Sequence, residues 1–505
     1  MPAWLFKIGA DRNGETMQKK KNRIYGSVFV LCCLAAGLFY EVNSPRRFVA
    51  MEILLLFGVL FAAFLMQKKG CGEAGTFMML GVAFLLRACY IIETPTWVRQ
   101  HDVIGFGTGF GQAGFIEYFY ENHKLIDFDP RTLWGFFQPP LHHMLAAIFL
   151  KINVLLGISY NHACENIQVL TLLYSMVMTV YTVKIMKEFH LSGKALLSGL
   201  CIVALHPCFI LMAGSINNDM LCILLQVMAV YYLIRWYREP KWKTIVILAL
   251  CVGGSMMAKL SGVLIAPAMA AVFLYRLWKE RENFKNYFLQ YLLFGVISIP
   301  IGIWSPVRNL LLFGVPLNYT PQVGEPVGNY SILQRLFDIR TDIPFTHLTA
   351  SGHSYDEFNV PLAMLKTSLL GEYDFGQAVP PVTPFAWILL LSGGILAVLA
   401  FAAMIAVLKK KGSMEAPMKI FFSMYYGVSM AFFLNLCFSI PNFSSQDFRY
   451  IAHLLVVEGL FLGLYVKDDA QKEKRWVRRI VMVLLPVFAI SCSAVYLLIG
   501  LYQWK

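Results

Sequence analysis

Acidic, amide and basic side chains recur in this sequence at the points where long apolar runs end. His101 and Asp102 follow one such run, within the stretch RQHDVIGFG, and Asn218 and Asp219 follow another, within SINND. Carboxylates placed at such points can accept protons or hold cations. These four residues are therefore candidates for a functional site.

Basic side chains lie at three further expected helix ends. Lys259 lies in AKLSG, Arg308 in RNLLLFGVPL, and Arg449 in SSQDFRYI, where Asp447 precedes it. Ionisable side chains at membrane depth cost free energy and usually mark a binding site or a pathway. For each residue alone, a charge tolerated at a helix end is an equally good interpretation. For the set as a whole, the pattern favours a site.

The apolar runs that would position these residues are long enough to cross a membrane. Of the 505 residues, 58% are hydrophobic and 14% are charged, whereas soluble domains are roughly 25% charged. Because runs of about 20 apolar residues recur along the chain, the sequence predicts an all-α polytopic membrane protein with about 13 or 14 spanning helices. A soluble enzyme is excluded. The candidate runs are residues 24–41, 48–66, 74–93, 139–158, 166–187, 195–214, 219–238, 243–277 (a hairpin of two), 286–306, 384–408, 418–440, 449–466 and 477–501.

The charge pattern predicts how these helices are oriented. The net charge is +13, with Lys and Arg in short blocks between apolar runs, as is typical of cytoplasmic connections. No nucleic-acid partner is expected. We expect a cytoplasmic tail over residues 1–23 and a single membrane domain over residues 24–505. The 11 cysteines are scattered without zinc-type spacing, so we expect them to be core residues.

Two connections are too long to be simple turns, residues 94–138 and residues 307–383, and both are expected to face outward. The first is amphipathic, which predicts interfacial helices. Within it, Glu117 and Glu121 would share a helix face, which suits a solvated face or the wall of an acidic site; we favour the solvated face. Its closely spaced glycines, Gly105, Gly107, Gly109 and Gly111, would give flexible backbone near a ligand. The second connection would form an outer cap. The run 139–158 opens with two prolines, and we expect it to be only partly embedded.

An outward site at lipid level, with a carboxylate and several cations, suits a substrate that is part lipid and part phosphate. A polyprenyl-phosphate sugar is such a substrate. Arg and Lys would hold the phosphate, which is also the leaving group, and a carboxylate would act as general base on the attacking hydroxyl. Direct displacement would invert the anomeric centre, whereas two carboxylates with a covalent intermediate would retain it.

The order of these residues resembles the GT-C membrane glycosyltransferases, in particular protein O-mannosyltransferases and the lipid A aminoarabinose transferase. The resemblance spans residues 74–466. In chain order the matching features are His101-Asp102, the amphipathic connection, QPPLHH at residues 138–143, Asn218-Asp219, Lys259, Arg308-Asn309 with Gly314 and Pro316, and Arg449-Tyr450. The family often has two adjacent acids in the first loop, where this chain has His101 and Asp102.

This resemblance implies an enzyme that transfers a sugar from a polyprenyl-phosphate donor to a glycan, lipid or protein acceptor, on the outer side of the cell membrane. Asp102 would be the base, with His101 beside it. The substrate-binding candidates are Gln138, His142, Asn218, Asp219, Lys259, Arg308 and Arg449. Some members hold a divalent metal near the phosphate and others need none; here Glu117, His142 and His143 are the conceivable ligands.

Two other classes of protein remain as alternatives. A secondary transporter or lipid flippase would fit the helix count, and Arg87 is the residue that fits it best. Such a protein should show repeated halves and broken helices that meet near the midplane. Here no internal repeat is visible, and the charges cluster at one side. A polymerase or ligase for lipid-linked glycans would share the outward connections and the cations but differ in its acceptor.

Overall fold

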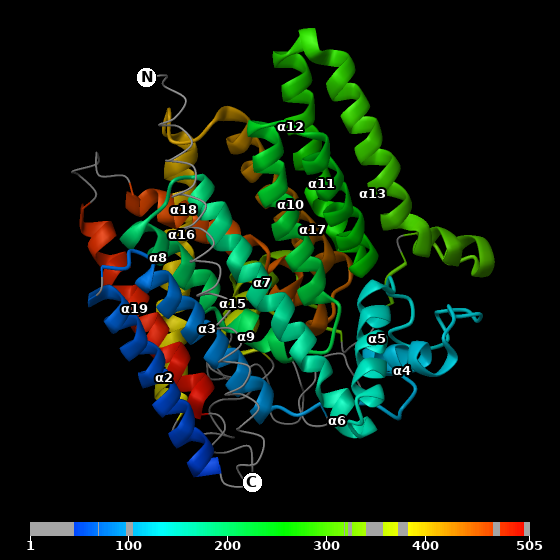
Figure 1. The fold of residues 1–505 in the computed structure, drawn as a ribbon, viewed down its shortest axis with the longest axis horizontal. Coiled ribbons are helices and arrows are strands. Elements are labelled where there is room, and N and C mark those ends of the chain that lie inside the picture. Colours follow the sequence, from blue (N-terminus) through cyan, green and yellow to red (C-terminus); the bar gives the residue numbers. More distant parts are fainter. Residues whose placement is uncertain are drawn as a thin grey trace, which may run out of the picture.

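The computed structural model describes residues 45–68, 70–96, 105–317, 319–321, 326–339, 357–371, 382–467 and 475–498. Its regular elements are α-helices and short 3-10 helices, with one isolated bridge between Pro326 and Asn442 (Figure 1). The predicted all-α fold is confirmed for these residues.

Nine helices in the described ranges are long and apolar enough to cross a membrane, and up to eleven spans result if each of two bent helix pairs counts as one. The nine are α2 (Pro45–Lys68), α3 (Ala74–Glu93), α7 (Ile167–Glu188) with the preceding α6 (Tyr160–Glu165), α10 (Asp219–Arg238), α12 (Ala266–Lys279) with the preceding η2 (Leu260–Ile265), α13 (Phe284–Phe313), α16 (Thr383–Lys409), α17 (Ala416–Ser439) and α19 (Arg475–Leu498). The bent pairs are α8 (Gly193–Ala204) with α9 (Pro207–Gly214), and the segment Phe443–Ile451 with α18 (Leu454–Lys467).

The number of spans in the described residues is smaller than the predicted 13 or 14 because three predicted crossings are not counted among them. The run 24–41 lies outside the described residues. Helix α5 (Leu141–Leu155) has 15 residues, a length of about 22 Å, which is short of the roughly 30 Å of hydrocarbon. The partial embedding of this segment stays a prediction. Helix α11 (Trp242–Ala258), the first half of the predicted hairpin, has 17 residues and is also below the length of the nine spans.

The bend of 47° between α8 and α9 explains the buried position of Arg87. Arg87 is fully buried in α3. Its Nε donates to Ser175 Oγ at 2.8 Å, and its NH1 donates to the carbonyl of Ala204 at 2.7 Å. Ala204 ends α8, and a helix C-terminus has free carbonyls and a partial negative charge. Arg87 therefore stabilises the end of α8 at this break.

The helices run between two ends of different character. Helix α10 runs from Asp219 to Arg238 and α11 returns to Ala258. Arg238 contacts Glu188 at the end of α7. We call this end, with residues 188–193, 238–243, 279–285 and 409–415, the basic end. The opposite end, with residues 94–96, 215–219, 259 and 440–451, is called the site end.

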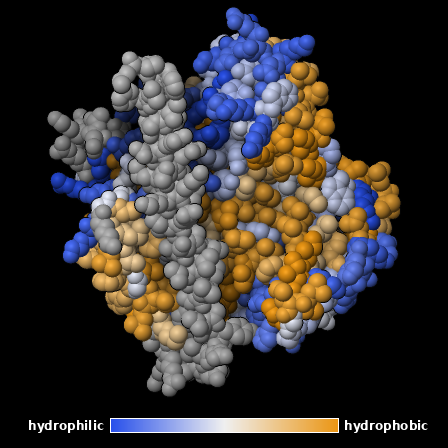
Figure 2. Space-filling view, in the orientation of Figure 1, coloured by the Kyte–Doolittle hydropathy of each residue, from blue (hydrophilic) through white to orange (hydrophobic). Residues whose placement is uncertain are grey.

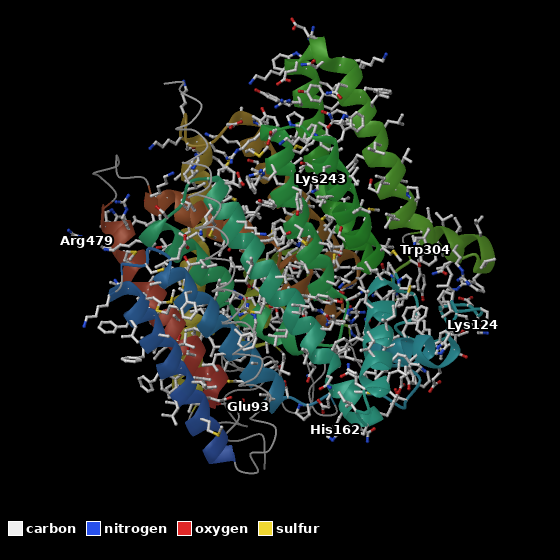
Figure 3. All side chains as sticks on the ribbon, viewed as in Figure 1. Glu93, Lys124, His162, Lys243, Trp304 and Arg479 are labelled. Atoms are coloured by element: carbon white, nitrogen blue, oxygen red, sulfur yellow. The ribbon has the colours of Figure 1, made fainter. Side chains whose placement is uncertain are left out.

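The surface supports this division. Figure 2 shows hydrophilic atoms over the basic end and an apolar band beside it along the helices. In Figure 3, Lys243 lies toward the basic end, whereas Glu93 and His162 lie at the opposite side of the bundle. The bundle therefore has the banded surface of a membrane protein. The predicted assignment of the basic end to the cytoplasm stays a prediction.

Helix α4 (Gly111–Asn122) of the first long connection packs with the following α5 and α6 as a small helical unit beside the bundle (Figure 1). Phe115 stacks on Phe136 in its own apolar core. Glu117 is buried against this core and accepts hydrogen bonds from Tyr160 Oη at 2.7 Å and from the backbone N–H of Gly107 at 2.8 Å. The predicted solvated face is thus wrong for Glu117, because a glycine turn packs over it, while Glu121 is exposed.

Candidate active site

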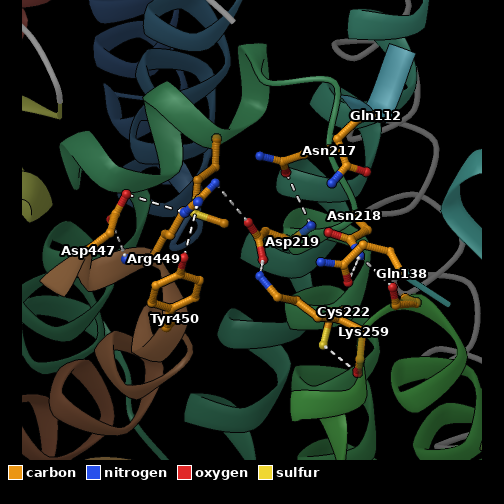
Figure 4. A network of polar contacts seen from close by, with 12 residues as sticks. Gln112, Gln138, Asn217, Asn218, Asp219, Cys222, Lys259, Asp447, Arg449 and Tyr450 are labelled. Atoms are coloured by element: carbon orange, nitrogen blue, oxygen red, sulfur yellow. Dashed lines mark hydrogen bonds and ion pairs between the residues drawn. The ribbon is translucent and has the colours of Figure 1, made fainter. Parts of the chain in front are cut away.

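A polar cluster lies at the site end, where three segments distant in sequence meet (Figure 4). Asp219 begins α10, Lys259 is the residue at which α11 ends, and Arg449 lies in the 3-10 helix η6 (Phe448–Ile451). Asp447 immediately precedes η6. Helix ends thus supply all four charges, as the sequence pattern indicates.

The four side chains form a chain of ion pairs. Lys259 Nζ donates to Asp219 Oδ1 in a close contact, and Arg449 NH1 lies 3.5 Å from Asp219 Oδ2. Arg449 Nε lies 3.3 Å from Asp447 Oδ2. The exposed fractions of the side chains are 4% for Asp219, 8% for Arg449 and 15% for Lys259. Two cations and two carboxylates therefore balance in a largely dehydrated setting, where each needs its partner.

Tyr450 lies against both cations. Lys259 Nζ is 4.8 Å from the centre of the Tyr450 ring, and Arg449 Cζ is 5.1 Å from it. Arg449 NH2 also lies 3.3 Å from Tyr450 Oη. An aromatic face attracts a cation without a formal charge of its own. Tyr450 thus orients both cations, a contact that the sequence did not indicate, because it showed Tyr450 only as the neighbour of Arg449.

Amide side chains fix the turn that carries Asp219. Asn217 Oδ1 accepts a hydrogen bond from the backbone N–H of Asp219 at 3.2 Å. Asn218 Nδ2 donates to the carbonyl of Ala258 at 2.8 Å and to Gln138 Oε1 at 3.2 Å. Asn218 therefore joins the start of α10 to the end of α11 and to the first long connection. These bonds hold Asp219 opposite Lys259.

The electrostatic environment keeps Lys259 charged. Burial lowers the pKa of the Lys259 ammonium, and the neighbouring Asp219 carboxylate raises it, so that the pKa lies above its ordinary value. An opposite charge at contact distance favours the charged form of a group. Lys259 is therefore a permanent cation at neutral pH, suited to an anionic ligand.

Two histidines lie buried beside the cluster on α5. Burial lowers the pKa of His142 to about 4, an effect that the Asp219 carboxylate opposes. His142 lies edge-on to Tyr174, with 6.2 Å between ring centres. The ring of His143 contacts Phe115, and its Nε2 pairs with Gln112 Oε1. Both imidazoles are thus uncharged at neutral pH and packed within protein.

The structure does not bring every candidate to this cluster. Arg308 donates to the carbonyl of Ile126, and its NH1 lies 3.5 Å from Asn309 Oδ1, so it joins α13 to the first long connection instead. His101 and Asp102 lie outside the described residues. The structure therefore gathers Gln138, Asn218, Asp219, Lys259 and Arg449, and places Arg308 elsewhere.

No metal-binding group forms from the histidine, cysteine and acidic side chains of the described ranges. Glu117 is held by Gly107 and Tyr160, whereas His143 pairs with Gln112. The three conceivable ligands Glu117, His142 and His143 consequently do not make one ligand set.

The helical bundle, with its buried charges at one end, has a fold like that of solved GT-C structures such as ArnT. Residues 138–304 match the family model described as dolichyl-phosphate-mannose-protein mannosyltransferase. This segment contains Gln138, Asn218, Asp219 and Lys259. The chain is thus a glycosyltransferase of the type that uses a lipid-phosphate sugar donor.

Solved structures share the fold at low sequence identity. ArnT from Cupriavidus metallidurans in the apo state has a TM-score of 0.50 and 12% identity, over 85% of this chain and 77% of that chain. ArnT from the same organism bound to undecaprenyl phosphate has a TM-score of 0.48 and 13% identity, with the same coverage. The apo Archaeoglobus fulgidus oligosaccharyltransferase has a TM-score of 0.49 and 12% identity, over 84% of this chain and 56% of that chain. No curated protein matches the chain.

Proposed function

We propose that the protein transfers a sugar from a polyprenyl-phosphate donor to an acceptor hydroxyl at the site end of the bundle, with Lys259 and Arg449 binding the donor phosphate. The observation that carries this proposal is that two cations, the buried Arg449 and the partly buried Lys259, converge on Asp219. The donor class follows from the family match over residues 138–304.

A phosphate bound here would be stabilised as its charge grows. When the glycosidic bond breaks, negative charge develops on the leaving phosphate, and cations already in place stabilise it without reorganisation. A Lys ammonium has three N–H donors and an Arg guanidinium has five. Each can therefore bind a phosphate oxygen while it keeps its carboxylate partner. Asp219 and Asp447 would hold the two cations in position before the donor arrives.

The general base is assigned to a different carboxylate. Asp219 contacts both Lys259 and Arg449, and a carboxylate between two cations is stabilised in its charged form, which makes it a poor proton acceptor. Asp102 therefore remains our candidate for the base, with His101 beside it. A single base and direct displacement would invert the anomeric centre. The site end would face the outside of the cell membrane, opposite the basic end.

The test uses the full chain in lipid nanodiscs with a panel of radiolabelled polyprenyl-phosphate pentoses and hexoses. Two readouts are taken: release of polyprenyl phosphate, and the Kd for undecaprenyl phosphate. Asp102→Asn should abolish transfer and leave the Kd unchanged, because it removes the base without changing shape. Arg449→Gln should raise the Kd. Turnover in Asp102→Asn would reject the base, and an unchanged Kd in Arg449→Gln would reject the phosphate site.

A further inference from the structure

The segment that carries Asp447 and Arg449 is held from one side by helix α15 (Val360–Leu370), which belongs to the second long connection. The hydroxyl of Thr367 accepts a hydrogen bond from the backbone N–H of Phe448 at 3.0 Å and donates to the carbonyl of Ala363 at 2.8 Å. Thr367 is buried. The first residue of η6 is thereby fixed to α15, one residue away from Arg449.

The same segment is also held through Gln446. Its Nε2 donates to the carbonyl of Glu357 at 2.7 Å, and its Oε1 accepts from Arg335 NH2 at 3.1 Å. Arg335 NH1 also donates to the carbonyl of Cys437, at the end of α17. Gln446 is 1% exposed, so these bonds lie away from competing water.

A buried ion pair fixes the relation between these two supports. Lys366 Nζ lies 2.8 Å from Glu357 Oε2, and the two side chains are 1% and 2% exposed. Glu357 Oε1 also accepts from the backbone N–H of Asn359. In such a buried pair the cost of desolvation offsets most of the attraction between the charges, so the pair adds little to the free energy of unfolding. Its main effect is to fix the position of one side chain relative to the other. Here it ties the Glu357 backbone to α15, next to Thr367.

We propose that Thr367 and the Glu357–Lys366 pair are positioning residues for Arg449. This inference rests on the proposed function, because it assigns their effect to binding of the donor phosphate. The outer cap expected of the second long connection stays a prediction. Within that connection, Glu357 and α15 contact the segment that carries the cation that would bind the donor.

The geometry explains why this support matters. Arg449 must reach Asp219 with NH1 and Asp447 with Nε at the same time. A misplacement of about 1 Å in a positioned group can cost on the order of a hundredfold in rate. Thr367 and the Glu357–Lys366 pair hold the segment that carries Arg449 in place. They would therefore affect the affinity for the donor phosphate and leave the affinity for the acceptor unchanged.

The first test replaces the Thr367 hydroxyl. Thr367→Val removes the acceptor for the Phe448 N–H at nearly constant shape and should raise the Kd for undecaprenyl phosphate about fivefold, the value of one typical hydrogen bond. The KM for the acceptor should not change. Thr367→Ser keeps the hydroxyl and should restore the Kd. Thr182→Val is the matched control, because Thr182 is buried and bonds only within its own helix, to Met178.

The second test is a double-mutant cycle on the ion pair. Lys366→Met and Glu357→Gln should each raise the Kd, and the double variant should be less affected than the sum of the singles, as expected for partners. Thermal unfolding is measured in parallel. If the variants melt earlier but bind undecaprenyl phosphate as the wild type does, their role is only structural and the inference fails. If Arg449→Gln also binds normally, the proposed function itself fails.

Discussion

The two ends of the bundle carry the same kinds of charge in different settings. At the basic end, Lys187 pairs with Glu73 at 2.9 Å, with side chains 41% and 21% exposed. At the site end, Lys259 pairs with Asp219, with side chains 15% and 4% exposed. Exposed pairs contribute about 0–1 kcal/mol to stability, whereas a buried charge that loses its partner is strongly destabilising.

This difference separates charges that orient the chain from charges that form a site. Positive charges at the end of a bundle can set its orientation while they remain hydrated. The partly buried Lys259 and the buried Arg449 are far more costly, and such groups usually serve a function. A cavity of about 690 Å³ also lies at the basic end, lined by Arg238, Lys410 and Lys467 among others.

Among substitutions that test this difference between the two ends, we expect the largest loss of transfer at Lys259. Lys259→Gln removes a phosphate ligand and leaves Asp219 with one cation fewer. We expect transfer to fall by about 10²–10³-fold, as when one electrostatic stabiliser is lost, and the free energy of unfolding to fall by about 3 kcal/mol. Turnover assays and thermal unfolding measure the two effects. Near-normal turnover would show that the buried pair is only structural.

A smaller effect is expected at Asn218, which supports the cluster without charge. Asn218→Asp places a carboxylate against the carbonyls of Ala258 and Gln138 that the amide now bonds. We expect about 2 kcal/mol less stability, the cost of buried groups without partners, and a clear loss of transfer. Asn122→Asp is the control, because Asn122 is exposed and bonds only to the carbonyl of Tyr118. Equal effects in both variants would contradict the account.

The pH dependence of donor binding should be flat on the alkaline side. The pKa of Lys259 is raised above its ordinary value. The contribution of the charged Lys259 to donor binding is therefore complete at any pH below the ordinary Lys pKa, and it is lost only when the pH rises through the raised pKa. The Kd for undecaprenyl phosphate should therefore stay constant from pH 7 to about 9.5, below the usual Lys pKa. A loss of binding with a midpoint in that range would show that Lys259 is not held by Asp219.

The smallest effect is expected at the basic end. Lys187→Gln removes the exposed pair with Glu73 and should change the free energy of unfolding by less than about 0.5 kcal/mol, as for surface positions in general. Transfer should remain within twofold of the wild type. A large loss of transfer in this variant would mean that the two ends do not differ as proposed.

Many residues of the cluster could be predicted from the sequence, because counting the membrane crossings assigns each helix end to one side of the membrane. Asn218, Asp219, Lys259 and Arg449 satisfied that criterion, and the structure brings them together. Their chemical roles stay predictions. Arg308 satisfied the same criterion yet lies against Ile126. Hydropathy locates a residue along the membrane normal but not around the axis of its helix.

Other parts of the site depend on contacts between distant segments. Glu117 and Glu121 are one helical turn apart, and only the glycine turn that packs over Glu117 distinguishes them. Thr367 bonds to Phe448 across 81 positions of sequence. A single sequence shows neither contact, because local spacing does not reveal which distant backbone packs against a helix face.

The most direct measurement compares two arginines, one from each end. Undecaprenyl phosphate is titrated into the full chain in nanodiscs for the wild type, for Arg449→Gln and for Arg238→Gln, which alters the pair with Glu188 at the basic end. The account predicts an increase in Kd of at least about tenfold for Arg449→Gln, as for loss of a hydrogen bond to a charged group, and no change for Arg238→Gln. Equal Kd values for the two variants would contradict it.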